Sequence, residues 1–206
     1  MDYFEQRARQ RGFGIIAGID EAGRGPLAGP VVAAAVVLPD NYSYPGIDDS
    51  KKLTARNRER LFEVIRADAL SVGIGVIDAP IIDEINILRA TLLAMKEAVA
   101  DLHITPDYLL VDGNRYVPVD VPQETIVKGD GRSISIAAAS IVAKVSRDRI
   151  MEIYHRQFPY YNFFKNKGYG TVEHRQAIKD HGFCKLHRRS FHIRETSQEN
   201  YELALK

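Results

Sequence analysis

The sequence predicts an α/β fold of the mixed α+β kind, with helices packed against a mixed sheet. Two apolar runs near the start, at residues 14–19 and 29–38, indicate neighbouring strands, and residues 71–77 alternate well enough for a third. Segments with helical periodicity then alternate with short apolar runs over the rest of the chain. Neighbouring strands followed by alternating helices and strands favour a mixed sheet covered by helices.

The composition suits a soluble cytoplasmic protein. The chain has 206 residues, 45% of them hydrophobic, which is enough for one large domain or a domain with an appendage. Cys184 is the single cysteine, so an internal disulfide is excluded, a zinc site lacks a companion thiol, and nothing indicates export. The longest purely apolar run, residues 31–38, is too short to span a bilayer, so we expect no membrane partner.

The first helix is expected between the second and third strands. Thr54 can cap a helix that runs to about Ala69. Its buried side would be formed by Leu61, Phe62, Val64 and Ile65. The preceding residues, 41–49, are rich in turn formers and would bring segment 49–53 to the surface.

A second helical region opens at Pro80 and continues to about Leu102. Its apolar residues recur with helical spacing at Ile85, Leu88, Leu92, Met95 and Val99. Short buried strands are expected at residues 108–111 and 125–127.

The last elements are helices. A long helix would begin at Ser133 or Ser135 and run through Ile153, with three consecutive alanines that permit close packing. A glycine-flanked loop then leads into a helix at residues 172–181. The residues after 195 could form a short helix or a frayed tail.

Acidic side chains stand at or beside the ends of three predicted strands. Asp20 and Glu21 follow the first strand, whereas Asp112 and Asp130 follow two later strands. Because successive strand side chains point to opposite faces, Asp20 and Glu21 can line one site only if the backbone bends there. A single Asp after a strand is more often a turn or cap residue. The adjacent Asp-Glu pair shifts the balance toward an active site.

A cluster of these four carboxylates would need cations, because like charges raise the pKa of their neighbours. Hard oxygen ligands without a cysteine or a regular histidine spacing select Mg²⁺ or Mn²⁺. Two such ions form the usual device for phosphodiester cleavage. Other active sites fit less well, because the sequence has no nucleophile-elbow serine and no Walker or dinucleotide-binding glycine motif.

The turn after the acidic pair could contact a nucleic acid. Arg24 can bind a phosphate, and its neighbours Gly23 and Gly25 expose main-chain groups that could hydrogen-bond a ribose 2′-hydroxyl. Without the acids, a plain turn with a surface arginine would be the better interpretation.

The C-terminal third is basic. Residues 144–194 hold twelve Lys or Arg against four acids, which suits a polyanion, although a solvated helical face is an equal alternative. By helical spacing Ser140, Lys144 and Arg147 share one face of the long helix, and Lys144 could reach a phosphate near Asp130. Tyr169 lies between two glycines and could stack on a sugar or base, or could instead pack into the core. Ser50, Lys51 and Lys52 offer further phosphate contacts or a solvated loop.

Several motifs together resemble a known family, bacterial type 2 ribonuclease H (ribonuclease HII). They occur in the family's order over nearly the whole chain and comprise GIDEAGRGPLAGP (18–30), DSKKL (49–53), VDGNR (111–115), KGD (128–130), AAASIVAK (137–144), NKGYGT (166–171) and HRRSF (187–191). Two related types match less well. Type 3 enzymes share the acids but are longer proteins with an additional N-terminal domain, and type 1 enzymes do not place Asp and Glu side by side.

The resemblance implies a ribonuclease H-like fold, a five-stranded mixed sheet with flanking helices. It divides the chain into a catalytic core, residues 1–155, and a C-terminal helical substrate-binding region, residues 156–206. It further implies that the metal-binding acids are Asp20, Glu21, Asp112 and Asp130, and that Gly23, Arg24, Gly25 and Tyr169 contact the substrate. We expect Ser50, Lys51, Lys144, Arg188 and Arg189 to add further substrate contacts.

The activity that the resemblance implies is hydrolysis of RNA in RNA/DNA hybrids and nicking of DNA duplexes at embedded ribonucleotides. The ends would be a 3′-hydroxyl and a 5′-phosphate, and two Mg²⁺ or Mn²⁺ ions would take part. We expect a monomer whose substrate is the nucleic acid, with no replication or repair protein partner identified. Two alternatives stay open: a DNA nuclease on the same fold, and a hybrid-binding module without catalysis.

Overall fold

The computed structural model describes residues 1–47 and 53–192. A five-stranded mixed sheet with the order β3-β2-β1-β4-β5 forms the centre, as predicted. The first three strands are antiparallel neighbours, and the last two run parallel to β1. Their bounds are β1 Ile16–Ala22, β2 Val31–Val37, β3 Ser71–Ile77, β4 Tyr108–Asp112 and β5 Gln123–Ile126.

The three parallel strands end at one edge of the sheet. Ile19 of β1 lies opposite Val111 of β4, and Asp112 lies opposite Ile126 of β5. Asp20 and Asp112, one residue further along each strand, are therefore neighbours across the sheet. This register brings acids from distant parts of the sequence to the same place.

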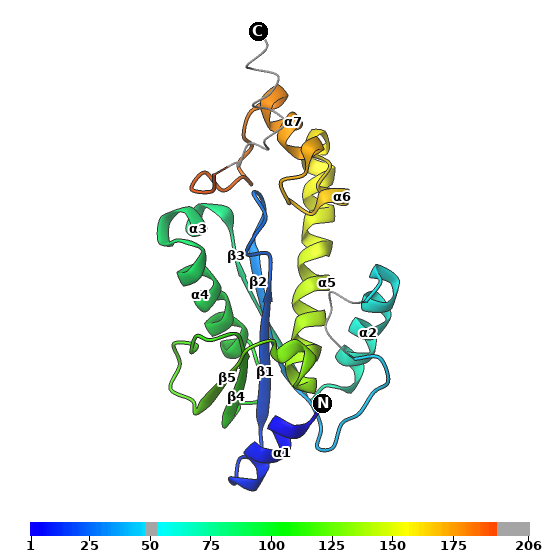
Figure 1. The fold of residues 1–206 in the computed structure, drawn as a ribbon, viewed down its shortest axis with the longest axis vertical. Helices are drawn as coiled ribbons and strands as arrows, with labels where there is room; N and C mark the ends of the chain where they lie inside the picture. The colour runs from blue at the N-terminus through cyan, green and yellow to red at the C-terminus, as the bar shows by residue number, and fades with distance from the viewer. Residues whose placement is uncertain (48–52, 193–206) are drawn as a thin grey trace.

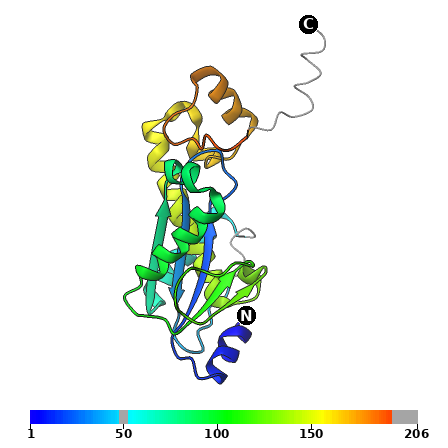
Figure 2. The same ribbon diagram turned by 90° about the vertical axis from the view of Figure 1, so that its left-hand side faces the viewer.

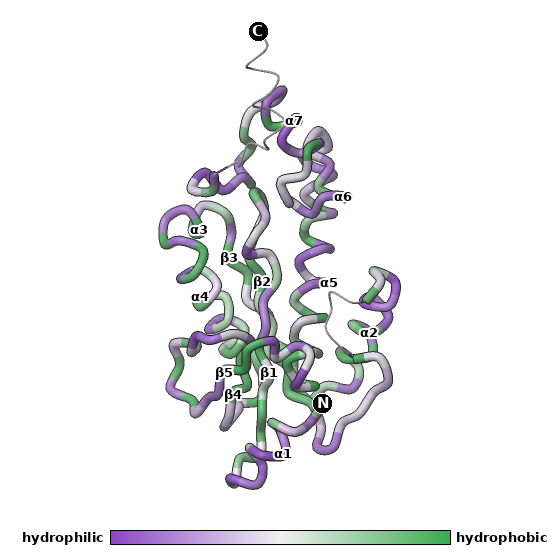
Figure 3. The backbone as a smooth tube through the Cα atoms, viewed as in Figure 1, coloured by the Kyte–Doolittle hydropathy of each residue, from purple (hydrophilic) through white to green (hydrophobic). Residues whose placement is uncertain are grey.

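Helices cover both faces of the sheet. The helix α5 (Ile134–Gln157), with α2 (Ala55–Asp68) outside it, lies on one side, and α3 (Ala79–Ile85) and α4 (Ile87–Ala100) lie on the other (Figure 1). The hydropathy colouring shows largely hydrophobic central strands and mixed outer helices (Figure 3). Predicted caps are confirmed, because Thr54 accepts a hydrogen bond from Asn57 N at 3.3 Å and Ser133 accepts one from Ile136 N at 3.2 Å.

Small residues let the two layers of helices approach the sheet closely. A Cβ on Gly18 of β1 would lie 2.1 Å from the main-chain carbon of Ser135 in α5. On the other face, Gly73 and Gly75 of β3 leave room for the carbonyls of Ala98 and Ala94 in α4. The prediction of the buried face of α4 is therefore only partly correct. Alanines of α4 contact the sheet, whereas Leu88, which was expected on the buried face, is 37% exposed.

Two other expectations were wrong. The acids Asp20 and Glu21 lie inside β1, which continues to Ala22, rather than after its end. The helix expected from Pro80 to Leu102 is two helices, because Asn86 has a φ of 68° and its side chain caps α4. The chain also begins with a helix for which no prediction was made, α1 (Tyr3–Gln10).

The C-terminal region lies over one end of the sheet (Figures 1 and 2). It contains the short 3-10 turn η2 (Pro159–Tyr161), α6 (Phe163–Asn166) and the predicted helix α7 (Val172–His181). A second 3-10 turn, η1 (Gly129–Gly131), precedes α5. The division at residue 155 stays a prediction, and α5 continues to Gln157. Within residues 1–47 and 53–192, no helix is long and apolar enough to cross a membrane.

Candidate active site

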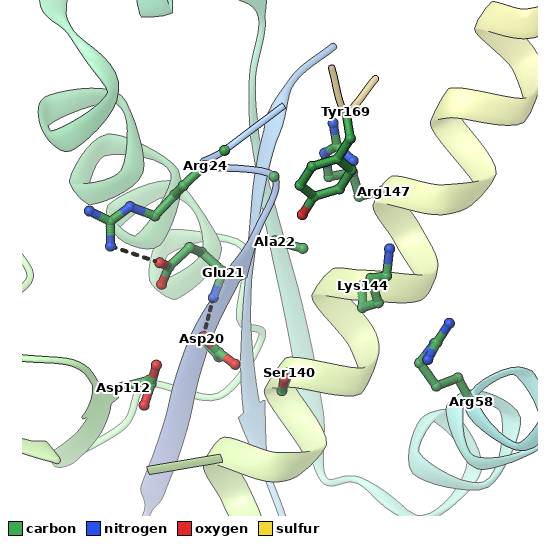
Figure 4. Close-up of a pocket in the computed structure, with 12 residues that line it drawn as sticks. Asp20, Glu21, Ala22, Arg24, Arg58, Asp112, Ser140, Lys144, Arg147 and Tyr169 are labelled. Atoms are coloured by element: carbon green, nitrogen blue, oxygen red, sulfur yellow. Dashed lines mark hydrogen bonds and ion pairs between the residues drawn. The ribbon is translucent and has the colours of Figure 1, made fainter. Parts of the chain in front are cut away.

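Three of the four predicted acids line one pocket. Asp20, Glu21 and Asp112 border a pocket of about 250 Å³ at the edge where the parallel strands end (Figure 4). Asp20 is 5% exposed and faces Ser140 of α5, whereas Glu21, the next residue of the strand, also borders a second pocket beside α4. The two side chains thus reach one site from opposite faces of a partly buried strand end.

Asp130 lies on the neighbouring turn η1 and does not line this pocket. Its turn is attached to the acidic edge, because Gly129 N donates a 2.7 Å hydrogen bond to Oδ1 of Asp112. In the part of the chain that the structure describes, no three acidic, histidine or cysteine side chains stand close enough to hold one ion together. The fourfold convergence expected from the sequence therefore stays a prediction.

The electrostatics of the pocket favour a cation. Burial raises the pKa of Asp20 well above its ordinary value, and the nearby carboxylates of Glu21 and Asp112 raise it further. Hydrogen bonds from Ser140 and from Glu21 N, the latter 2.7 Å long, act in the opposite direction. A divalent ion would remove the repulsion, and the oxygen-only donor set suits Mg²⁺ or Mn²⁺.

Cations form the opposite wall of the same pocket. Lys144 and Arg147 project from α5 together with Ser140, which confirms the predicted shared face, and Arg58 comes from α2 (Figure 4). Lys144 donates a 2.7 Å hydrogen bond to Asp148, and burial lowers its pKa. The pocket therefore offers negative charge on one side and positive charge on the other, an arrangement that suits a phosphate held between metal and cation.

The glycine turn and Tyr169 close the pocket. Gly23 has a φ of 98°, and a Cβ there would lie 2.1 Å from Nε of Arg147, so only glycine fits. The Arg24 side chain turns back to Glu21, with 3.2 Å between Nη1 and Oε1. Tyr169 is 47% exposed and points into the pocket, where its Cε1 would lie 3.7 Å from a Cβ on Gly25 (Figure 4). This position is consistent with the prediction that the ring is available to stack on a sugar or base, and not with the alternative that it packs into the core.

The remaining predicted contacts lie elsewhere. Arg188 is 1% exposed, lies behind the glycine turn and does not line the pocket. Arg189 is exposed, and its backbone N–H donates a 2.9 Å hydrogen bond to Asp83. The segment with Ser50 and Lys51 falls outside the described residues. Sequence reasoning missed Arg58, which no motif separates from its neighbours on α2.

Two buried histidines lie behind Tyr169. His174 and His187 are 0% and 3% exposed, and their Nε2 atoms are 3.1 Å apart. Burial, together with the neighbouring His174, lowers the pKa of His187 to about 4, and burial also lowers the pKa of His174.

Acid should weaken the fold through these histidines. The pKa of histidine in an unfolded chain is about 6.5, whereas that of folded His187 is about 4. Between these two pH values the unfolded chain binds a proton that the folded protein does not. This contribution to stability is complete above pH 6.5 and is lost between about 6.5 and 4, by about 3 kcal/mol for His187 alone. Urea unfolding at several pH values measures it, and His187→Gln should flatten the slope in that window. Equal slopes for the two proteins would contradict the prediction.

The carboxylates lie where the parallel strands β1 and β4 of a mixed sheet end, and they face cations across one pocket. This combination of fold and site defines a nuclease of the ribonuclease H-like class. The comparisons agree with this class. The family model described as "Ribonuclease HII" matches residues 17–194. The chain belongs to the ribonuclease HII family.

Individual relatives and solved structures are similar to the chain over most of its length. A ribonuclease HII from Syntrophus aciditrophicus is 65% identical over 98% of this chain and 95% of its own length. The Archaeoglobus fulgidus ribonuclease HII, solved in a complex with PCNA, is 26% identical, with a TM-score of 0.76 over 91% of this chain and 100% of that one. A protein titled Bst-RNase HIII, solved with Mn²⁺, shares the fold at 19% identity and a TM-score of 0.66, covering 96% of this chain and 72% of that one.

Proposed function

We propose that this chain is an endonuclease that hydrolyses the RNA strand of RNA/DNA hybrids and nicks DNA duplexes on the 5′ side of embedded ribonucleotides. The observation that carries the proposal is the single pocket that joins the acids, the cations, the glycine turn and Tyr169. Membership of the ribonuclease HII family supports it. The products would be a 3′-hydroxyl and a 5′-phosphate.

Asp20, Glu21, Asp112 and Asp130 would hold divalent Mg²⁺ or Mn²⁺, two ions when substrate is bound. Such ions supply an activated water and stabilise the leaving oxygen. The chain's own residues do the rest of the positioning. Lys144 and Arg58 would neutralise charge on a phosphate in the pocket. Because Lys144 also donates a hydrogen bond to Asp148, its ammonium group would serve both partners.

Recognition would come from the turn and from Tyr169. The main chain at Gly23, Arg24 and Gly25 offers hydrogen-bonding groups to a 2′-hydroxyl, which only a ribonucleotide carries. The Tyr169 ring, half-exposed at the pocket, can pack on the deoxyribose that follows. Together these contacts would select an RNA-to-DNA junction.

Replacing Tyr169 with alanine should damage junction cutting more than metal binding. We expect kcat/KM for a duplex with one embedded ribonucleotide to fall about 10–100-fold, because a stacking contact is worth about 1–3 kcal/mol. Mn²⁺ affinity, measured calorimetrically, should be unchanged. Tyr160→Ala is the matched control, since Tyr160 is 70% exposed in the same region but does not line the pocket. Equal losses for the two variants would argue against the assignment.

The alternatives give different results with the same substrates. A DNA nuclease on this fold would cut a duplex that contains no 2′-hydroxyl. A binding module would retain hybrid without cutting it, and binding would not depend on metal. The pocket's acids and glycine turn argue against both.

The location and partners of the enzyme are also part of the proposal. A reducing cytoplasm is supported by the single cysteine, and a monomer is expected. The Archaeoglobus relative supports a replication partner of the PCNA kind, although the tail after residue 192 falls outside the described residues.

A further inference from the structure

One dipeptide, His187-Arg188, is connected to both halves of the recognition site: Arg188 bonds directly to the glycine turn, and His187 reaches Tyr169 through His174. The glycine turn follows β1, and Tyr169 precedes α7, so more than a hundred residues separate them in the chain. Backbone hydrogen bonds join this part of the chain to the residues that follow the glycine turn: Arg188 N donates to Leu27 O, and Gly29 N donates to O of Leu186, the residue before the dipeptide, both at 2.8 Å. Neither side chain of the dipeptide lines the pocket.

The Arg188 side chain holds the glycine turn by its carbonyls. Its Nη2 donates to Gly23 O at 2.6 Å and to Gly29 O at 2.8 Å, its Nη1 to Arg24 O at 3.0 Å, and its Nε to Gly29 O at 3.0 Å. A guanidinium has donors in a rigid planar fork, so these bonds fix the direction of each carbonyl.

Fixing the carbonyls also fixes the groups offered to a ligand. In a planar trans peptide, the N–H points away from the carbonyl of the preceding residue. With the carbonyls of Gly23 and Arg24 directed at Arg188, the N–H groups of Arg24 and Gly25 point to the opposite side of the turn. Arg188 thereby sets the orientation of the turn's donors without touching the pocket.

The His187 side chain holds Tyr169 through His174. Cys184 N–H donates to Nδ1 of His187 at 3.0 Å, so the proton of neutral His187 sits on Nε2. That proton is donated to Nε2 of His174 at 3.1 Å, which leaves the His174 proton on Nδ1, and Nδ1 donates to Tyr169 O at 2.9 Å. Each of these bonds is satisfied only when both imidazoles are neutral, with this tautomer on each.

We propose that His187 and Arg188 are positioning residues that set the spacing between the glycine turn and Tyr169, and so determine the preference for an RNA-to-DNA junction. The inference rests on the proposed function of the same pocket. It assigns His174 as the link between His187 and the Tyr169 main chain. A hydrogen bond from Leu27 N to Gly168 O, at 2.8 Å, completes the connection between the two halves.

The tautomers can be measured without any substrate. Long-range ¹H–¹⁵N spectra of the full chain at pH 7.5 should show two neutral buried histidines, with the proton on Nδ1 in His174 and on Nε2 in His187. Assignments come from comparison with the variants described next. A protonated ring, or the opposite tautomer at either position, would overturn the proposed chain of hydrogen bonds.

Substitution by asparagine and by glutamine should have opposite effects on activity at the two histidine positions. An Asn amide nitrogen replaces Nδ1, and a Gln amide nitrogen replaces Nε2. At position 174 the donor to Tyr169 is Nδ1, so His174→Asn should cut a junction substrate nearly as well as the unsubstituted protein, while His174→Gln should lose about tenfold in kcat/KM. At position 187 the donor is Nε2, so His187→Gln should retain activity and His187→Asn should lose about tenfold.

Arg188→Lys keeps the charge but lacks the fork, and it should also lose about tenfold on the junction substrate. A long uniform hybrid separates the positioning of Tyr169 from folding, because its cleavage by the folded histidine variants should fall less than threefold. Arg188→Lys should lose activity on both substrates, because each ribonucleotide of the hybrid presents a 2′-hydroxyl to the glycine turn. In a Tyr169→Ala background His187→Asn should cost little more, since its target is already lost.

Three outcomes would overturn the inference. They are the same ranking of Asn and Gln at both histidine positions, equal losses by the histidine variants on the junction substrate and the uniform hybrid, and additive losses of His187→Asn and Tyr169→Ala. If the unsubstituted protein cut neither substrate, the proposed function would fail and this inference with it. If it cut both and only the variant order was wrong, the inference alone would fail.

Discussion

Asp20→Asn should abolish cleavage and at the same time make the metal-free protein harder to unfold. Burial and the carboxylates of Glu21 and Asp112 raise the pKa of Asp20, so its ionised form is unfavourable in the folded state. For an acid with a raised folded pKa, stability is greatest below the unfolded pKa and is lost as pH rises through the folded one. At pH 7 an uncharged amide avoids that loss.

The activity of this variant should fall by about a thousandfold or more, equivalent to about 4 kcal/mol of transition-state stabilisation, because metal binding is lost. Urea unfolding in a chelator measures the gain in stability, and Mg²⁺ should raise the melting temperature of the unsubstituted protein but not of the variant. Asp180→Asn, an exposed change on α7, serves as the control and should alter neither property. Full Mg²⁺-dependent activity in Asp20→Asn would show that the metal site is wrongly assigned.

Arg147→Met should cause the largest loss of stability. Arg147 is 1% exposed and donates to the carbonyls of Pro30, Lys167 and Ala28 at 2.9, 3.0 and 3.2 Å. Hydrogen bonds from a charged donor contribute about 1.5–3 kcal/mol each. Burial opposes them, since it lowers the pKa of Arg147 to about 10, a cost of about 3 kcal/mol. The net loss should be about 2–5 kcal/mol.

The same helix supplies the control for this change. Arg149 is paired with Glu59 and Glu63 at the surface, and Arg149→Met should cost less than about 1 kcal/mol. Free energies of unfolding from urea titrations give both numbers. Because Arg147 also supports Gly23, junction cleavage should fall for Arg147→Met and stay constant for Arg149→Met. Similar destabilisation by the two variants would contradict the role given to Arg147.

The elements that position the site could be predicted from local sequence. The strand at 71–77 and the helix at 172–181 have the predicted bounds, because alternation, a Thr cap and flanking glycines are local signals. The helix α1 carried no comparable signal. Its buried Glu5 accepts hydrogen bonds from Ser133 and Ser135 at the start of α5, a partnership across the whole chain that no short pattern shows.

The supporting arginines could not be assigned from the sequence for a related reason. Arginine is normally exposed, so a basic segment indicates a surface or a nucleic-acid contact. Arg147 and Arg188 instead lie behind the glycine turn and hold main-chain carbonyls. The acids carry local signals, because adjacency and strand ends mark them, and their role as metal ligands stays a prediction. The extension of β1 through Glu21 depends instead on pairing with β2.

The most direct test uses a DNA duplex with a single ribonucleotide, incubated with the unsubstituted protein and Mg²⁺, with an all-DNA duplex of the same sequence beside it. We predict one nick on the 5′ side of the ribonucleotide, leaving a 3′-hydroxyl and a 5′-phosphate, and no cut in the all-DNA duplex. Cleavage of both duplexes, or of neither, would contradict the assignment of this pocket to ribonucleotide recognition and hydrolysis.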